Sequence, residues 1–166
     1  MSAGPAEIRE WNALPDAELF ALARETADRV HGRKVLLRGL VEVSSECAMN
    51  CLYCGIRRDN RAARRYRLSA GTLTATVRAG LRAGFRTFVL QGGEADYLRG
   101  EGLLRLVETA RASAGEGPAI TLSFGIRSKI EYAELRAAGA DRYLMRFETA
   151  DPDLHRRLRA GIPLRR

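Results

Sequence analysis

Residues 40–54, LVEVSSECAMNCLYC, lead from an apolar, β-branched stretch directly into the three cysteines of the chain. Cys47, Cys51 and Cys54 stand at the spacing C-x3-C-x2-C, within eight residues of one another. Cysteines that only filled a core would be scattered, so this spacing indicates a shared task. The residues before Cys47 have the composition of a strand. The sequence therefore predicts a loop of three thiols at the carboxyl end of a strand.

Strands and helices are predicted to alternate along the rest of the chain. We predict strands over residues 34–45, 85–93, 119–125 and 141–149. We predict helices over residues 15–30, 70–83, 100–114 and 128–138, and a further helix that begins at residue 151. Ser69 and Asp151 stand where N-caps are expected, and Gly32, Gly84 and Gly139 stand just past helix ends.

This alternation defines an α/β fold made of parallel βα units with right-handed crossovers. Four such units are the first half of an eight-stranded (β/α)8 TIM-type barrel, in which chemistry sits at the carboxyl ends of the strands. The unusual stretches of the sequence lie at such ends: the cysteine loop, QGGEADY (91–97), SFGIRS (123–128) and RFETAD (146–151). Their shared location is a stronger functional signal than any one of them.

Half a barrel leaves two strand edges without partners. We therefore expect either that the sequence is truncated or that it pairs with another polypeptide. The expected organisation is an N-terminal helical extension over residues 1–33, followed by a partial barrel core over residues 34–166.

The composition bounds the kind of protein. With 166 residues and 46% hydrophobic content, the chain has the size and composition of one folded domain. No window approaches the roughly 18 apolar residues of a membrane span, and no secretory signal is visible at the N-terminus. An odd number of clustered cysteines is a poor disulfide framework, so we expect a reducing, cytoplasmic setting and no membrane partner.

The net charge of +8 raises the question of nucleic-acid binding. Lys34 and Lys129 are the only lysines, so 26 of the 28 basic residues are arginines, and they are spread over the whole chain. The densest run, RRDNRAARRYR (57–67), could touch phosphate, but a solvated loop explains it better. Aromatic residues are not interleaved as in nucleic-acid platforms, so we do not expect nucleic acid as a partner.

Three thiolates suit a [4Fe–4S] cluster better than a zinc ion. A structural zinc site usually takes four protein ligands, and neither His31 nor His155 stands at a ligand-like spacing from the cysteines. A cubane cluster held by three thiolates leaves one iron open for a substrate or cofactor. Gly55 would allow a close approach of the backbone, and Tyr53 could shield the cluster or stack on a ligand. Loosely reactive cysteines or a zinc loop remain the alternatives.

The C-x3-C-x2-C spacing, with aromatic Tyr53 before its last cysteine, resembles the signature of radical S-adenosylmethionine (SAM) enzymes. Further stretches resemble, within that superfamily, the group of the [FeFe]-hydrogenase maturase HydE and the methylornithine synthase PylB. They are LVEVSSECAMNCLYCGIRRDN, RYRLS, FRTFVLQGGE, AITLSFG and LRAAGADRYLMRFETADPDLH. Biotin synthase is similar more distantly. The resemblance runs from about residue 15 to 160 and covers the first half of that family's barrel.

The resemblance implies an enzyme with a [4Fe–4S] cluster and SAM as cofactors. It implies reductive cleavage of SAM to a 5′-deoxyadenosyl radical, in the maturation of the hydrogenase H-cluster. The implied partners are a small-molecule or iron-complex substrate, a low-potential electron donor and other maturation proteins. PylB-like rearrangement of lysine to methylornithine, or biotin-synthase-like chemistry, is the alternative within the superfamily.

Residue roles follow from the resemblance. It implies that Cys47, Cys51 and Cys54 ligate the cluster, and that Arg146 and Glu148 act at the catalytic site. The implied cofactor-binding residues are Tyr53, Gln91, Gly92, Gly93, Glu94, Thr121, Ser123, Arg146 and Glu148. Among them Tyr53 would lie beside the adenine, Glu94 would receive the amino group of SAM, and Glu148 would bind the ribose. A structural set of ion pairs at the strand ends is the alternative for Glu94, Arg146 and Glu148.

The sequence also departs from the family pattern. Phe147 replaces a histidine between Arg146 and Glu148, and Ile126 replaces a carboxylate after Gly125. Three cysteines that hold an auxiliary cluster in some relatives are missing, as is the second half of the barrel. Two further interpretations therefore stay open: a fragment that at most binds a cluster, and a zinc- or nucleic-acid-binding module.

Overall fold

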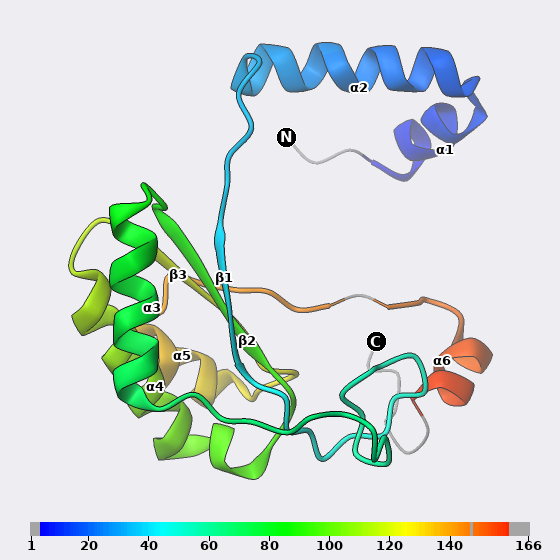
Figure 1. Cartoon of the computed structure of the whole chain (residues 1–166). Coiled ribbons are helices and arrows are strands. Elements are labelled where there is room, and N and C mark those ends of the chain that lie inside the picture. Colours follow the sequence, from blue (N-terminus) through cyan, green and yellow to red (C-terminus); the bar gives the residue numbers. More distant parts are fainter. Residues whose placement is uncertain (1–3, 147, 160–166) are drawn as a thin grey trace. The chain divides into compact units, whose positions relative to one another are not determined.

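The computed structural model describes residues 4–146 and 148–159 (Figure 1). The chain divides into two compact units, Met1–Leu36 and Leu37–Arg166. Phe147, where the sequence departs from the family pattern, and residues 160–166 lie outside the described residues. No helix in the described ranges has both the length and the apolar character needed to cross a bilayer.

The first unit holds two helices, α1 (Pro5–Ala13) and α2 (Asp16–His31). Gly32 ends α2 with a φ of 60°, as the sequence predicts. Helix α1 was not among the predicted elements, because its nine residues are too few for a clear apolar period. The start of α1 is nevertheless determined by neighbouring residues. Pro5 occupies the first turn, and the Glu7 carboxylate accepts a hydrogen bond from the Gly4 amide.

The second unit is a four-stranded parallel sheet with the order β1-β2-β3-β4, which confirms the predicted fold class. Its strands are β1 (Gly39–Ser44), β2 (Thr87–Gly92), β3 (Ala119–Ser123) and β4 (Arg142–Tyr143). Its helices are α3 (Ala70–Arg82), α4 (Gly100–Ala114), α5 (Lys129–Ala137) and α6 (Pro152–Leu158), with a 3-10 turn η1 (Asp96–Leu98) before α4.

The predicted caps form. The Ser69 side chain accepts from the Thr72 amide at the start of α3, and the Asp151 carboxylate accepts from the amides of Asp153 and Leu154 at the start of α6. Gly84 and Gly139 follow α3 and α5 with φ values of 91° and 110°. Only a residue without a side chain adopts that backbone conformation at low cost.

One face of the sheet packs against the helices, and Figure 1 shows α3, α4 and α5 on that same side. The core consists of alternate strand residues together with the apolar stripes of the helices. Its fully buried members include Val77, Phe88, Leu90, Leu103, Val107, Ile120 and Leu122. Burying a side chain of this size contributes about 1.5–3 kcal/mol, so this face holds the unit together.

The residues of the other face form two layers across the strands. Leu40, Val89 and Thr121 pair in register in one layer. Glu42, Gln91 and Ser123 pair in the next, closer to the carboxyl ends of the strands. The second layer is polar in all three strands, whereas barrel interiors are usually filled by branched apolar residues. The inner face thus changes from apolar to polar toward the cysteine loop.

All four strands are shorter than predicted, and the difference is largest for β1 and β4. Residues 34–38 precede β1 rather than belong to it, because the ladder to β2 begins at the pair Gly39 and Phe88. β4 comprises two residues instead of the predicted 141–149, because its single neighbour β3 ends at Ser123 and the chain turns at Gly125. Arg146 and Glu148 therefore lie in an irregular segment beyond the strand.

Candidate functional site

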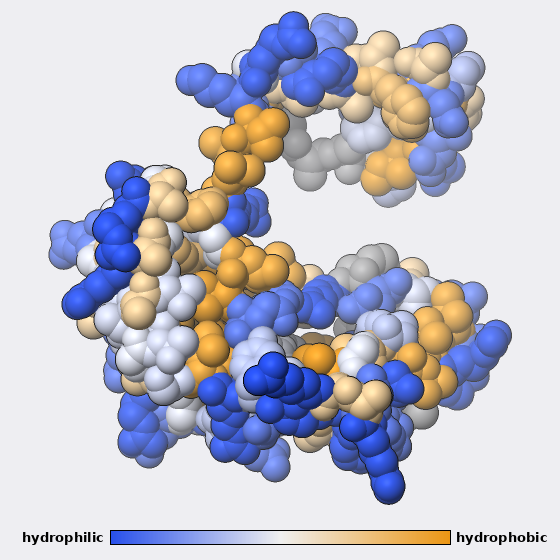
Figure 2. Space-filling model, viewed as in Figure 1, coloured by the Kyte–Doolittle hydropathy of each residue, from blue (hydrophilic) through white to orange (hydrophobic). Residues whose placement is uncertain are grey.

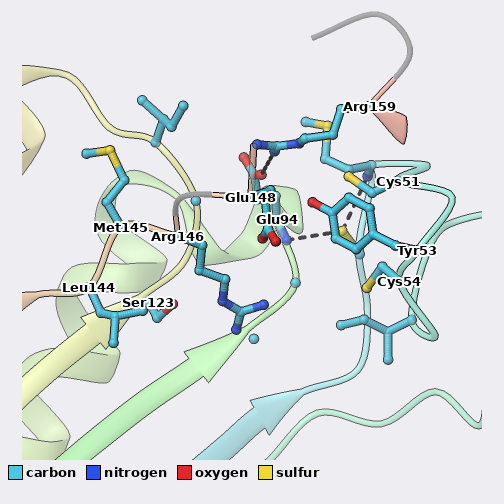
Figure 3. A pocket seen from close by; sticks show the side chains of 17 residues that line it. Cys51, Tyr53, Cys54, Glu94, Ser123, Leu144, Met145, Arg146, Glu148 and Arg159 are labelled. Carbon is cyan, nitrogen blue, oxygen red and sulfur yellow. Dashed lines mark hydrogen bonds and ion pairs between the residues drawn. The ribbon is translucent and has the colours of Figure 1, made fainter. Parts of the chain in front are cut away.

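A pocket at the carboxyl ends of the strands brings the three cysteines together with residues from the other strand ends (Figure 3). Figure 3 shows Cys51, Tyr53 and Cys54 on one side of it, Ser123, Leu144 and Arg146 on the other, and Glu94 between them. Of the predicted site residues, those lining the pocket are Cys47, Cys51, Tyr53, Cys54, Gly92, Gly93, Glu94, Ser123, Arg146 and Glu148.

All three cysteines are free thiols, with Cys51 buried and the other two half-buried. The Sγ atom of Cys47 accepts hydrogen bonds from the amides of Met49 and Glu94, each at 3.4 Å. The backbone around Cys47 thus directs two N–H groups at one sulfur atom.

The loop that carries the cysteines is folded around one arginine. The Arg65 guanidinium donates to the carbonyls of Ser45 and Ile56, at 2.6 and 2.7 Å, and to those of Arg57 and Asn60, at 2.7 and 3.2 Å. These carbonyls belong to both sides of the cysteine sequence. Arg65 thus fixes the shape of a long irregular segment that has no helix or strand of its own.

Gly93 makes the contact between the cysteine loop and the end of β2. A Cβ atom at this position would lie 2.1 Å from the Glu46 carbonyl oxygen and 2.5 Å from Cβ of Cys47. By contrast, nothing lies within 4 Å of where Gly55 would carry a Cβ atom. Within the protein the close backbone approach is therefore at Gly93, whereas the approach predicted at Gly55 concerns a bound group and stays a prediction.

Glu94 projects into the pocket between the strand ends. Gly125 makes room for it, because a Cβ atom there would lie 2.3 Å from Cδ of Glu94. The carboxylate lies 3.6 Å from the guanidinium of Arg159, and both side chains are largely buried. This ion pair is too long to be a good hydrogen bond, and Nε of Arg159 is buried without a partner among the described residues.

Arg159 is the charged lining residue of the pocket that sequence reasoning missed. It follows α6, whose end is attached to the cysteine loop because the Leu52 amide donates to the Leu158 carbonyl at 2.9 Å. Burial by itself lowers the pKa of Arg159, but Cys51, Tyr53 and Glu94 raise it above the ordinary value. No local pattern marks an arginine at a helix end as a pocket residue, and here the pairing with Glu94 joins residues 65 positions apart.

A second set of contacts crosses the polar layer of the inner face. The Gln91 amide nitrogen donates to the Glu42 carboxylate, and the Arg146 guanidinium donates to the Gln91 amide oxygen at 2.7 Å. This row of contacts joins β1, β2 and the segment after β4. Gln91 does not line the pocket itself but lies directly behind Arg146.

Thr121 lies apart from this constellation. It is buried on the inner face, one layer below Ser123, and its hydroxyl has no hydrogen-bond partner within residues 4–146 and 148–159. It does not line the pocket. The structure therefore brings ten of the predicted site residues to one pocket and leaves Gln91 and Thr121 on the adjoining inner face.

Tyr53 adds a polar group to the cysteine side of the pocket. Burial of its hydroxyl and the neighbouring charge of Cys51 raise the pKa of Tyr53 to about 12. The phenol therefore remains protonated at neutral pH and can donate a hydrogen bond.

The donor set suits a polynuclear centre. No group of three or more histidine, cysteine or acidic side chains within the described part of the chain converges on a point as a single ion requires. A tetrahedral zinc ion would draw each sulfur to about 2.3 Å from one centre. A [4Fe–4S] cluster instead takes each thiolate on a different iron, so its ligands surround a larger object. Three cysteines around a pocket fit the cluster.

Comparison with known proteins identifies the class. The sequence profile of the Radical SAM superfamily matches residues 41–166. The chain therefore belongs to the radical SAM superfamily. The family implies a [4Fe–4S] cluster and SAM as cofactors, as the resemblance in the sequence predicts.

Relatives with known names narrow the comparison. The chain is 41% identical over 141 residues to the [FeFe] hydrogenase maturase subunit HydE of Thermotoga maritima, covering 85% of this chain and 40% of that protein. It is 30% identical over 145 residues to the 3-methylornithine synthase of Methanosarcina acetivorans, covering 87% of this chain and 41% of that protein. The chain thus spans about two fifths of the length of these relatives.

Solved structures agree on the fold. The crystal structure of methylornithine synthase (PylB) superposes with a TM-score of 0.82 at 26% identity, covering 98% of this chain and 49% of that one. The structure of HydG, a maturase of the [FeFe]-hydrogenase, gives a TM-score of 0.78 at 19% identity, covering 92% of this chain and 36% of that one. The second likeness concerns the fold alone.

Proposed function

We propose that this chain provides the cluster-binding half of a HydE-like radical SAM enzyme that cleaves SAM reductively during maturation of the [FeFe]-hydrogenase H-cluster. The observation that carries the proposal is the pocket in which three free cysteines face Glu94. The 41% identity to HydE supports this group over others. In this organisation residues 1–33 are a helical extension and residues 34–166 are the barrel part of the enzyme.

The residues of the pocket divide the work between cluster and SAM. Cys47, Cys51 and Cys54 would hold the [4Fe–4S] cluster, with the amides of Met49 and Glu94 stabilising the thiolate of Cys47. When bound, the cluster supplies the electron for reductive cleavage of SAM. Thiolates persist in a reducing compartment, so we place the protein in the cytoplasm.

The SAM side of the pocket is anionic where an ammonium would bind. Glu94 would accept a hydrogen bond from the amino group of the methionine moiety. Gly92 and Gly93 have no side chains, so the ligand could approach the backbone closely there. Tyr53 would lie against the adenine, and Glu148 would accept hydrogen bonds from the ribose hydroxyls. Arg146, held by Gln91, would act on the side of the pocket that faces the substrate.

The substrate and partners follow from the same proposal. A small-molecule or iron-complex substrate would enter over the polar layer of Glu42, Gln91 and Ser123, with Thr121 deeper on the same face. A low-potential electron donor and other maturation proteins are the expected partners. An amino-acid substrate is the second candidate, because two of the similar proteins are 3-methylornithine synthases.

Electron paramagnetic resonance (EPR) tests the proposal. The purified chain is reconstituted anaerobically with iron and sulfide, reduced with dithionite and measured with and without SAM. We expect a [4Fe–4S]⁺ signal that changes when SAM is added. The variant Cys51→Ser should lose the signal.

Two results would contradict the proposal. A chain that takes up zinc in preference to iron would support the zinc-module alternative. A cluster whose signal is indifferent to SAM would show that these residues hold iron without organising the cofactor.

A further inference from the structure

Six arginines lie between residues 57 and 67, and the proposed function uses none of their side chains directly. Two of them, although exposed, are engaged by other groups of the protein. Arg65 donates to the loop carbonyls, and Arg67 forms a forked pair with Glu46 and stacks 3.9 Å from the ring centroid of Tyr97. Arg58, Arg61 and Arg64 are also exposed, and Arg58 pairs with the neighbouring Asp59 at 2.9 Å. We refer to these three residues as the arginine rim.

The rim is fixed to the cysteine loop through its backbone. The Arg58 amide donates to the Met49 carbonyl at 2.8 Å, and the Ser45 hydroxyl donates to the Arg64 carbonyl at 2.8 Å. Between them, Arg57 donates from its guanidinium to the Cys54 carbonyl at 3.2 Å. The backbone that carries the rim therefore keeps a defined position beside the three cysteines.

Helix α6 adds charge beside the same loop. Arg156 and Arg157 are exposed on its last turn, and the helix end meets the loop through the hydrogen bond from Leu52 to Leu158. Leu52 itself is 58% exposed, although it directly follows Cys51. Figure 2 shows hydrophilic residues interspersed with hydrophobic ones at the lower right, where Figure 1 places the loop between β1 and α3 and helix α6. An exposed apolar side chain thus lies among exposed arginines, of which Arg156 pairs with Asp153 at 2.7 Å.

An electron has to reach this loop from outside the chain. All three cysteines of the sequence lie in the loop, so the chain has no thiols for a second cluster of its own. We propose that the arginine rim, with Leu52 and the last turn of α6, is the docking surface for an acidic electron-transfer protein. One electron passes from the reduced donor to the oxidised cluster, and no bond is made or broken. This inference rests on the proposed function of the cysteine loop.

Charge and shape both favour such a partner. Clustered guanidinium groups steer an acidic protein to the surface and raise its association rate by about 10- to 1,000-fold at low ionic strength. Electron-transfer encounters bury little area, so a small exposed apolar centre inside a charged rim suffices. A single strand of nucleic acid would instead need several stacking aromatics, whereas Tyr66 is the one aromatic residue among residues 57–67.

The test compares two triple variants of equal charge change. R58E/R61E/R64E reverses the rim, whereas R78E/R82E/R86E reverses three exposed arginines in α3 and just before β2, away from the cysteine loop. The probe is an acidic flavodoxin in its fully reduced form, and its one-electron oxidation by the reconstituted chain is followed by stopped-flow absorbance. At low salt we expect the rim variant to react at least tenfold more slowly than the wild type, and the control variant within about twofold. The difference should shrink as salt rises.

The proposal would be overturned if both variants oxidised flavodoxin at the same rate at every salt concentration. It would also be overturned if both variants lost the same fraction of the wild-type rate. Binding of the oxidised flavodoxin to the cluster-free chain, measured by calorimetry, tests the surface even if no cluster forms. Dithionite reduction and the EPR response to SAM should be unchanged in the rim variant, which separates this inference from the proposed function. Should the rim variant fold poorly, R58Q/R61Q/R64Q gives the same comparison. Tighter binding to a single-stranded oligonucleotide than to flavodoxin would also contradict it.

Discussion

The guanidinium of Arg159 lies 3.6 Å from Oε1 of Glu94, in the pocket that the three cysteines line. Glu94 follows β2 and Arg159 follows α6, so the contact closes the pocket from two distant parts of the chain. Both side chains are largely buried. Because this carboxylate and guanidinium are held together without a close hydrogen bond, each keeps the capacity to bind a further partner.

Glu94→Gln removes the negative charge while preserving the shape of the side chain. A hydrogen bond to a charged group contributes about 1.5–3 kcal/mol, so we expect SAM to bind about 10- to 150-fold more weakly. The [4Fe–4S]⁺ signal should persist, because the Cys47 sulfur contacts the backbone amide of residue 94 and not its side chain. SAM titrations followed by EPR measure both the affinity for SAM and the intensity of the cluster signal. Glu101→Gln, in an exposed pair with Arg105, is the control and should bind SAM normally.

Gly93→Ala should prevent cluster assembly. The added methyl group would lie 2.1 Å from the Glu46 carbonyl oxygen, so the cysteine loop would have to move away from β2. Backbone atoms cannot yield as a flexible side chain can. Gly55→Ala adds the same methyl group where nothing lies within 4 Å and should assemble the cluster normally. Iron content and the absorbance of the reconstituted proteins give the comparison, and full iron uptake by the Gly93 variant would refute the expectation.

The sequence predicts those features of the fold that depend on near neighbours. Ser69, Asp151 and Gly139 mark their helix ends through contacts or backbone angles within a few residues, and all three act as expected. The parallel sheet follows from the alternation of strands and helices. The predicted length of β4 was wrong, because a strand ends where its neighbouring strand ends. The turn at Gly125, where the chain leaves β3, cannot be predicted from residues 141–149.

The candidate site could be predicted in part for the same reason. The cysteines lie within eight residues, so their spacing alone predicts a shared ligand. Arg159 is joined to Glu94 only by the fold, and Glu42 meets Gln91 only through strand register. Long-range contacts of this kind leave no periodic or local pattern in one sequence. The role of Arg65 was hidden likewise, since its run of arginines resembles a solvated loop.

Asp141 should make the stability of the second unit depend on acid pH. Burial by itself would raise the pKa of its carboxyl group, but the Ile120 amide and the Arg111 guanidinium hold that pKa below its ordinary value. The contribution is therefore fully present above the unfolded pKa of about 3.9 and is lost as pH falls through the lower folded value. Because 36% of its side chain is exposed and solvent screens the pair with Arg111, Asp141→Asn should cost about 0.5–1 kcal/mol at pH 7.

Urea unfolding from pH 7 to pH 3 measures this dependence. The difference in unfolding free energy between the wild type and Asp141→Asn should narrow as the pH falls. Asp153→Asn removes a carboxylate whose side chain is 82% exposed and should change stability by less than about 0.5 kcal/mol at any pH. A constant difference between the wild type and Asp141→Asn would show that the effect does not arise from ionisation.

Arg65→Gln should loosen the cysteine loop while leaving the sheet intact. The guanidinium donates to carbonyls of Ser45, Ile56 and Arg57 within 2.7 Å, and glutamine has neither the reach nor the number of donors to replace it. Hydrogen exchange should increase in residues 45–66 and stay unchanged in β2 and β3, and cluster yield should fall. Arg64→Gln removes the neighbouring, outward-facing charge and should leave both exchange and cluster yield as in the wild type. If Arg65→Gln and Arg64→Gln show the same hydrogen exchange and the same cluster yield, the hydrogen bonds of Arg65 do not fix the shape of the loop.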